Sequence, residues 1–144
     1  MNYDDQVLLQ QRALETKKNP GKWSKTGGHV DAGETIKEAI KIEVYEEIGL
    51  KVNDNEIINI EIFKSSNSNE RYFAYGYIFY TNLSEEQFVL QKEEVKQVKY
   101  YSIEQIEEMK KSNNNECAFC KWDNESFNKQ INLLKKYRDL IKNN

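Results

Sequence analysis

The residues best suited to chemistry are three glutamates in the middle of the chain, Glu43, Glu46 and Glu47. In a helix, residues three or four positions apart are neighbours on one face, and like charges at that spacing repel each other. The arrangement therefore costs stability unless a cation lies among the carboxylates. The spacing predicts a metal site.

The element that positions these glutamates is a helix predicted from Thr35 to Ile48. Thr35 and Glu38 form a capping-box pattern, in which each side chain satisfies a free backbone N–H of the first turn. Gly49 supplies the left-handed residue that ends many helices. The sequence thus fixes both ends of this helix.

The apolar face of the same helix bears on where the acids point. At about 100° per residue, the aliphatic residues fall on one stripe: Ile36, Ile40, Val44 and Ile48. Glu47 lies inside this stripe, and Glu43 and Glu46 lie on its edge. The acids therefore lean towards the core, which indicates a lined cleft and not a solvated face.

The remaining elements are predicted from alternation and turn signals. Strands are expected at 7–9, 23–26, 57–63, 71–80 and 95–101, a short helix at 103–110 after the capping residue Ser102, and an amphipathic helix over about 127–141. The polar segment 65–69 is expected to join two of the strands as a hairpin connection. Strands interspersed with helices indicate an α/β or α+β sandwich in a single domain.

The bulk composition excludes several classes of protein. The 144 residues suit one domain, and 38% hydrophobic with 31% charged residues is typical of a globular chain. A net charge of -3 gives no basis for nucleic-acid binding. There is no apolar run near the roughly 18 residues of a membrane span. The acidic start of the chain does not resemble a signal peptide, so a cytoplasmic location is expected.

The two cysteines, Cys117 and Cys120, admit a redox or zinc role. A zinc site normally needs four ligands, and the single histidine, His29, is distant in sequence. The sequence therefore favours two reduced thiols in a loop.

Residues 28–50 resemble the Nudix box, written G-x5-E-x7-R-E-U-x-E-E-x-G-U with U an aliphatic residue. The positions that match are Gly28, Glu34, Glu43, Val44, Glu46, Glu47, Gly49 and Leu50. Segments 7–12, 21–23 and 94–102 are also similar to the family, and the resemblance is weakest after residue 111. It implies one Nudix domain over residues 1–144, an α/β/α sandwich with a mixed sheet between helices.

The resemblance also implies an activity. Nudix (MutT-like) proteins hydrolyse the diphosphate linkage of nucleoside diphosphate derivatives and depend on Mg²⁺ or Mn²⁺. Hard divalent ions prefer oxygen ligands, neutralise diphosphate charge and acidify bound water. The expected partner is a small nucleotide or diphosphate substrate, with no nucleic acid and no membrane.

The family's roles transfer onto the matching positions. Glu43, Glu46 and Glu47 would be catalytic and hold the metal, with the carbonyl of Gly28 as a further ligand, and Glu43 is the first choice of general base. Supporting carboxylates are expected from Glu34 and from Glu94 or Glu93.

Substrate contacts are assigned with their alternatives. Arg12 can contact phosphate or form an ordinary surface ion pair. Trp23, Tyr72 and Phe73 can stack a nucleobase or pack in the core. His29 is expected to be a loop or core histidine without a catalytic role.

One position departs from the box. Ile42 replaces an arginine that, in the family, pairs with a box carboxylate and helps orient it, and isoleucine has no donor. Lys41 lies about 100° around the helix and cannot simply replace it. Either catalysis is weakened or another cation, such as Lys25 or Arg12, has taken over.

Two other functions remain open. Ile42 is compatible with a nucleotide-binding or regulatory module that has lost efficient catalysis. Segments 28–34 and 93–95 are similar to the isopentenyl-diphosphate isomerase branch of the family, but Gly27 stands where that enzyme has a catalytic cysteine. The family usually has more chain ahead of residues 6–10, so an early strand is expected to be missing, which makes a homodimer more plausible.

Overall fold

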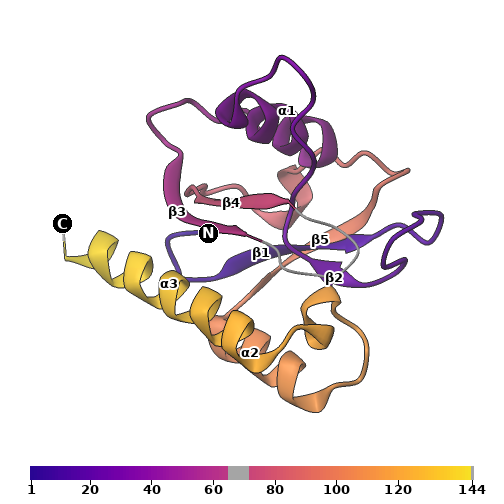
Figure 1. Ribbon diagram of the computed structural model, residues 1–144, viewed down its shortest axis with the longest axis vertical. Coiled ribbons are helices and arrows are strands. Elements are labelled where there is room, and N and C mark those ends of the chain that lie inside the picture. Colours follow the sequence, from indigo (N-terminus) through magenta and orange to yellow (C-terminus); the bar gives the residue numbers. More distant parts are fainter. Residues whose placement is uncertain (65–71, 144) are drawn as a thin grey trace.

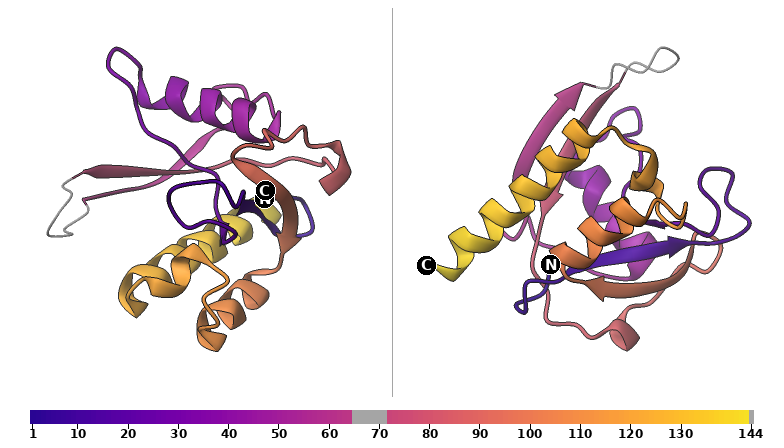
Figure 2. Two further views of the ribbon diagram at one scale, coloured as in Figure 1. Left: turned by 90° about the vertical axis from the view of Figure 1, so that its right-hand side faces the viewer. Right: turned by 90° about the horizontal axis from the view of Figure 1, so that it is seen from below.

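The computed structural model describes residues 1–64 and 72–143. The elements are β1 (Val7–Arg12), β2 (Trp23–Ser24), α1 (Ile36–Ile48), β3 (Ile58–Lys64), β4 (Phe73–Ile78), β5 (Val95–Tyr101), α2 (Ile103–Ser112) and α3 (Asn124–Lys142), with 3₁₀ turns η1 (Glu85–Gln87) and η2 (Ala118–Lys121). Strands form the middle layer, α1 lies on one side of them, and α2 and α3 lie on the other (Figures 1 and 2). This is the expected α/β sandwich.

The strands of the described residues lie in two sheets. One has the order β2-β1-β5, and the other is the hairpin of β3 and β4. The pairings within both sheets are antiparallel, and a single parallel bridge joins Trp23 to Cys117. The hairpin prediction is confirmed. Its connection at 65–69 lies outside the described residues.

Side-chain alternation along β1 divides the core in two. Successive residues of a strand point to opposite faces of a sheet. Leu9 therefore packs with Ile106 of α2 and Phe127 of α3, whereas Leu8 packs with Val44 of α1 and Val98 of β5. Gln10 and Arg12 share the α1 face with Leu8, so the polar end of β1 is aimed at the helix that carries the glutamates.

The ends of α1 are those that the sequence predicts. Thr35 Oγ1 accepts a hydrogen bond from the Glu38 N–H, and the Glu38 carboxylate accepts one from the Thr35 N–H. Gly49 ends the helix with φ of 71°, and its N–H donates to the Tyr45 carbonyl at 2.9 Å. The capped helix fixes the register of every glutamate that it carries. The capping prediction at Ser102 and the C-terminal helix are also confirmed.

The prediction of two reduced thiols is wrong. Cys117 and Cys120 form a disulfide and are buried among the core residues beneath the three-stranded sheet. The turn η2 between them brings their Cα atoms to 5.3 Å, which is within the range that a disulfide needs. Spacing alone did not reveal this turn.

None of the helices within the described residues is long and apolar enough to cross a membrane.

Gly49 offers a test of how α1 is held. A Cβ added there would lie 2.7 Å from the Cβ of Val89 and 2.9 Å from its carbonyl oxygen, besides requiring a left-handed backbone. We expect Gly49→Ala to lower the free energy of unfolding by about 3 kcal/mol, since strain and overlap both act. Gly33 also has a positive φ, of 92°, but open space around it. Gly33→Ala should therefore cost only about 1 kcal/mol in urea unfolding. Equal losses would contradict the packing of α1 against Val89.

Candidate active site

The candidate site is built on the face of α1 that meets β1. Val44 and Ile48 anchor this face in the core. Glu47 faces β1 on the same side of the helix, and the residue is only 6% exposed. A buried carboxylate is costly unless it is hydrogen-bonded or paired with a cation. The prediction that Glu47 lies within the apolar stripe is confirmed by its burial.

Gln10 of β1 supplies that hydrogen bond. Its amide Nε2 donates to Oε2 of Glu47 at 2.8 Å, and its own Oε1 accepts from the hydroxyl of Thr26 at 2.8 Å. Gln10 is 1% exposed. Neither Gln10 nor Thr26 was singled out from the sequence. The signal was available in the alternation of β1, which puts Gln10 on the same inward face as Leu8.

Gly28 lies directly against the carboxyl group of Glu43. A Cβ built on Gly28 would lie 2.0 Å from Cδ of Glu43 and 2.1 and 2.5 Å from its two oxygens. Such distances are far shorter than any van der Waals contact, so any side chain at this position would have to displace the Glu43 carboxylate. The structure thus brings together the first glycine and the first helical glutamate of the box, 15 residues apart in the sequence.

The pKa values of the two inner carboxyl groups, those of Glu43 and Glu47, are raised. Burial is the main cause for Glu43, and the negative charge of Glu46 adds to it, while the charge of His29 acts the other way. Burial likewise raises the pKa of Glu47, the hydrogen bond from Gln10 opposes this, and the charge of Glu43 raises the pKa further. Crowded carboxylates with raised pKa values are typical of functional sites that bind a cation or move a proton.

Arg12 and Glu94 complete the rim of this cluster. Nη2 of Arg12 lies 3.7 Å from Oε2 of Glu94, and both charges act on the pKa of Glu47, Arg12 lowering it and Glu94 raising it. The segment that carries Glu94 is fixed by its backbone, because the N–H of Gln91 donates to the Glu47 carbonyl and the N–H of Ala13 to the Glu94 carbonyl. Glu93 is exposed.

The remaining box acids lie further out. Glu46 is exposed, and Glu34 lies in the loop before α1, where its carboxylate accepts a hydrogen bond from the Asp31 N–H at 3.2 Å. Over residues 1–64 and 72–143, no three Asp, Glu, His or Cys side chains form a ready-made metal cage. Magnesium does not require one, because it commonly binds through one or two carboxylates and keeps waters or substrate phosphates. The donor set and the glycine cradle at Gly28 fit such an ion.

Of the two cations expected to replace the box arginine, Lys25 is a wrong prediction. Its Nζ donates to Gln130 of α3 and lies over the ring of Trp122. Lys25 therefore contacts the helical layer on the side of the sheet away from α1. Arg12 does act on Glu47 electrostatically, but the direct contact comes from Gln10. Ile42 is 42% exposed on α1.

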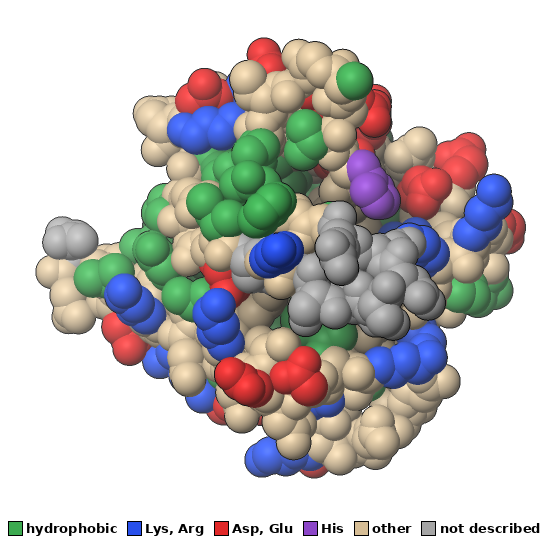
Figure 3. Space-filling view, viewed as in Figure 1, with side chains coloured by type: hydrophobic (Ala, Val, Ile, Leu, Met, Phe, Trp, Pro, Cys, Tyr) green, Lys and Arg blue, Asp and Glu red, His purple; other side chains and the backbone are tan. Residues whose placement is uncertain are grey.

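The aromatic candidates separate by environment. Trp23 is half-buried, and its ring packs edge-on against that of Tyr101, with 5.3 Å between the ring centres. It belongs to the core between the sheet and the helices α2 and α3, which agrees with the core-packing alternative. Phe73 is 65% exposed and Tyr72 is also exposed, so both are accessible to a ligand. His29 is exposed in the loop before α1, and Figure 3 shows the chain's histidine on the surface.

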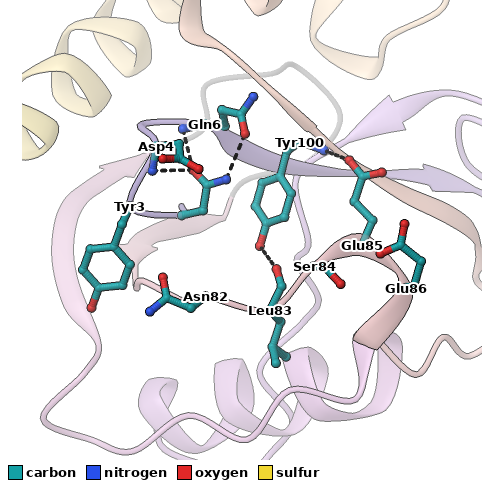
Figure 4. A pocket seen from close by; sticks show the side chains of 10 residues that line it. Tyr3, Asp4, Gln6, Asn82, Leu83, Ser84, Glu85, Glu86 and Tyr100 are labelled. Atoms are coloured by element: carbon teal, nitrogen blue, oxygen red, sulfur yellow. Dashed lines mark hydrogen bonds between the residues drawn. The ribbon is translucent and has the colours of Figure 1, made fainter.

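A separate depression lies between the N-terminal turn and residues 82–86 (Figure 4). Several of its polar groups bond to one another. The Tyr100 hydroxyl donates to the Leu83 carbonyl, and the Tyr100 N–H donates to the Glu85 carboxylate. Its lining residues include none of the box residues, so it is not part of the candidate site.

Comparison with known proteins agrees with this geometry. The sequence profile of the NUDIX domain matches residues 1–120. A curated relative, the putative nudix hydrolase 1 of Caenorhabditis elegans, is 37% identical over 81 residues, which is 56% of this chain and 20% of the relative. The chain therefore belongs to the Nudix family. It spans only about a fifth of that relative's length.

Solved structures show the same fold. A crystal structure from Deinococcus radiodurans superposes with a TM-score of 0.63 at 19% identity, covering 73% of this chain and 64% of the other. An Ap4A hydrolase of C. elegans gives 0.59 at 16% identity over 96% and 88% of the two chains. The NUDIX domain of Shewanella oneidensis NrtR, complexed with ADP ribose, gives 0.59 at 18% identity over 74% and 70%.

Gly28 provides a direct test of the glutamate contact. Because the added methyl of Gly28→Ala meets the end of a flexible side chain, we expect Glu43 to be displaced with the fold intact. Binding of Mn²⁺, followed by electron paramagnetic resonance, should weaken about 10-fold or more. Gly27 has open space around its Cβ position, so Gly27→Ala is the matched control and should bind as the parent does. Equal affinities in both variants would contradict a role for the contact.

The raised pKa of Glu47 predicts a pH dependence of stability in chelator-treated protein. Below the ordinary value of 4.5, the folded and unfolded states both hold the proton. As the pH rises above 4.5, the unfolded state loses it first, so the folded state binds more protons and stability falls. The fall ends above the raised folded pKa. Glu47→Gln has no such proton, so its urea midpoint should fall less between pH 4 and 7. Parallel curves would argue against the raised pKa.

Proposed function

We propose that this protein is a metal-dependent hydrolase that cleaves the diphosphate linkage of a nucleoside diphosphate derivative. The observation that carries the proposal is the close approach of Gly28 to Glu43, next to the buried Glu47. Together these groups put crowded carboxylate oxygens where the loop before α1 passes the C-terminal half of the helix. Family membership supports hydrolysis of phosphoanhydride bonds as the general reaction.

Glu43 and Glu47 would hold Mg²⁺ or Mn²⁺, with Glu46 and the Gly28 carbonyl as further ligands. The ion, when bound, neutralises diphosphate charge and lowers the pKa of bound water. Glu43 is the proposed general base, since a carboxyl group whose pKa is raised towards neutrality accepts a proton more effectively during reaction. Arg12, on the rim, is the proposed phosphate contact, and exposed Phe73 the proposed contact for a base.

The substrates to test first follow from the neighbours. Ap4A and ADP-ribose are both adenosine compounds that contain a phosphoanhydride linkage. The first is named as the substrate of one protein with this fold, and the second is bound to another. Their common unit is a nucleoside attached to a phosphoanhydride. A panel around that unit, with magnesium present, covers the proposed class.

Substitution of the inner glutamates tests the proposal. We expect Glu43→Gln and Glu47→Gln to lower hydrolysis of the best panel substrate by about 100-fold or more, because each loses a charged oxygen and Glu43 its basicity. Glu108→Gln, on the exposed side of α2, is the control and should retain full activity. Removal of the metal with a chelator should abolish turnover. Full activity in both glutamate variants would overturn the mechanism.

A nucleotide-binding module without efficient catalysis is the second candidate, favoured by Ile42 at the box arginine. It predicts calorimetric binding of a nucleotide with no hydrolysis of any panel member. The variant Ile42→Arg separates two cases. A strong rise in the hydrolysis rate would show that the native site is weakened by the missing arginine, and an unchanged rate would show that the site is complete without it. The isomerase alternative is not carried further, because Gly27 occupies its cysteine position and both cysteines form the core disulfide.

A further inference from the structure

Two linked hydrogen bonds, one buried and one partly buried, run from the strand layer to the helix of the candidate site. Within the described residues, Gln10 and Glu47 are the polar side chains buried in the core. The hydroxyl of Thr26 donates to Gln10, and Gln10 donates to Glu47, both at 2.8 Å. These hydrogen bonds connect three elements: β1, α1 and the segment that follows β2. Each partner thus comes from a different part of the sequence.

The two bonds fix which way the Gln10 amide points. An amide has one donor end and one acceptor end, and a carboxylate can only accept. The Thr26 hydroxyl engages the carbonyl end of the amide, which leaves the NH₂ end for Oε2 of Glu47. Rotation of the amide by half a turn would put two oxygens against each other. Thr26 therefore acts on Glu47 through the orientation of Gln10.

We propose that Gln10, held by Thr26, is the positioning residue that sets the direction of the Glu47 carboxylate for metal binding in this chain. The inference rests on the proposed function. An amide donor is neutral, so it occupies one lone-pair direction of Oε2 and leaves the negative charge of Glu47 in place for a cation. The charged alternative, Arg12, lies at the rim and contacts Glu94 instead. Ile42 contributes no donor.

The neighbouring glutamine of the same strand provides the contrast. Gln11 points to the opposite face, where its Nε2 donates to the Gly21 carbonyl and its Oε1 accepts from Gln97. It has the same chemistry and two hydrogen bonds, but no contact with the glutamates. A general need for glutamine hydrogen bonds in β1 would affect both positions, whereas a positioning role concerns Gln10 alone.

The experiment measures Mn²⁺ affinity by electron paramagnetic resonance without any nucleotide. Gln10→Met keeps the length of the side chain and removes the donor, so we expect the Mn²⁺ dissociation constant to rise about 10- to 100-fold. Gln11→Met is the matched control and should bind as the parent does. Thr26→Val, which removes one neutral hydrogen bond, should weaken binding about 2- to 10-fold, and Thr26→Ser should restore it.

The outcomes separate the inference from the function on which it rests. If the parent protein binds no Mn²⁺, the proposed function fails. If the parent binds Mn²⁺ and Gln10→Met, Thr26→Val and Gln11→Met bind equally well, the positioning role of Gln10 fails and the metal site stands. Should Gln10→Met not fold, as judged by urea unfolding, the comparison of Thr26→Val with Thr26→Ser decides.

Discussion

The crowding of negative charge on one half-buried side of α1 is the constraint on which the rest of the structure depends. Glu43, Glu46 and Glu47 share this side of the helix, and the environment makes ionisation of the inner two unfavourable. Such an arrangement is stable only where the surrounding elements hold the helix firmly and supply compensating donors. The fold does both. It fixes the helix at its two ends and places a strand with an inward polar end beneath it.

The fixing elements act mainly through backbone atoms and small residues. The capping box begins α1, and Gly49 ends it against Val89. Gly28 removes the Cβ that would otherwise displace Glu43. The lower layer contributes indirectly, because the Trp23 N–H donates to the Glu116 carbonyl and so ties β2 to the segment before the disulfide. The loop that leads from β2 to Gly28 is thereby anchored at its start.

Local signals in the sequence predicted much of this. Caps, apolar periodicity and the box spacing gave α1, its bounds and the burial of Glu47, because each depends on residues within a few turns of one another. The contacts that were missed depend on pairing between distant segments. Gln10 meets Glu47 only once β1 lies across α1, and Lys25 turns to α3 for the same long-range reason. Prediction of the disulfide would have required prediction of the turn η2, and no periodic pattern in the sequence indicates that turn.

The segment from Val89 to Glu94 is attached to the site through its main chain, since its N–H and carbonyl groups bond to Ile48, Glu47 and Ala13. The side chains of residues 91–93 within it are exposed and are not needed to hold the helix. Substitutions at these three positions can accumulate without disturbing the glutamates of α1. Positions 91–93 therefore form a stretch of chain beside the glutamates that can vary, in evolution or in a designed library. Changes there can alter ligand preference while the reactive groups keep their positions.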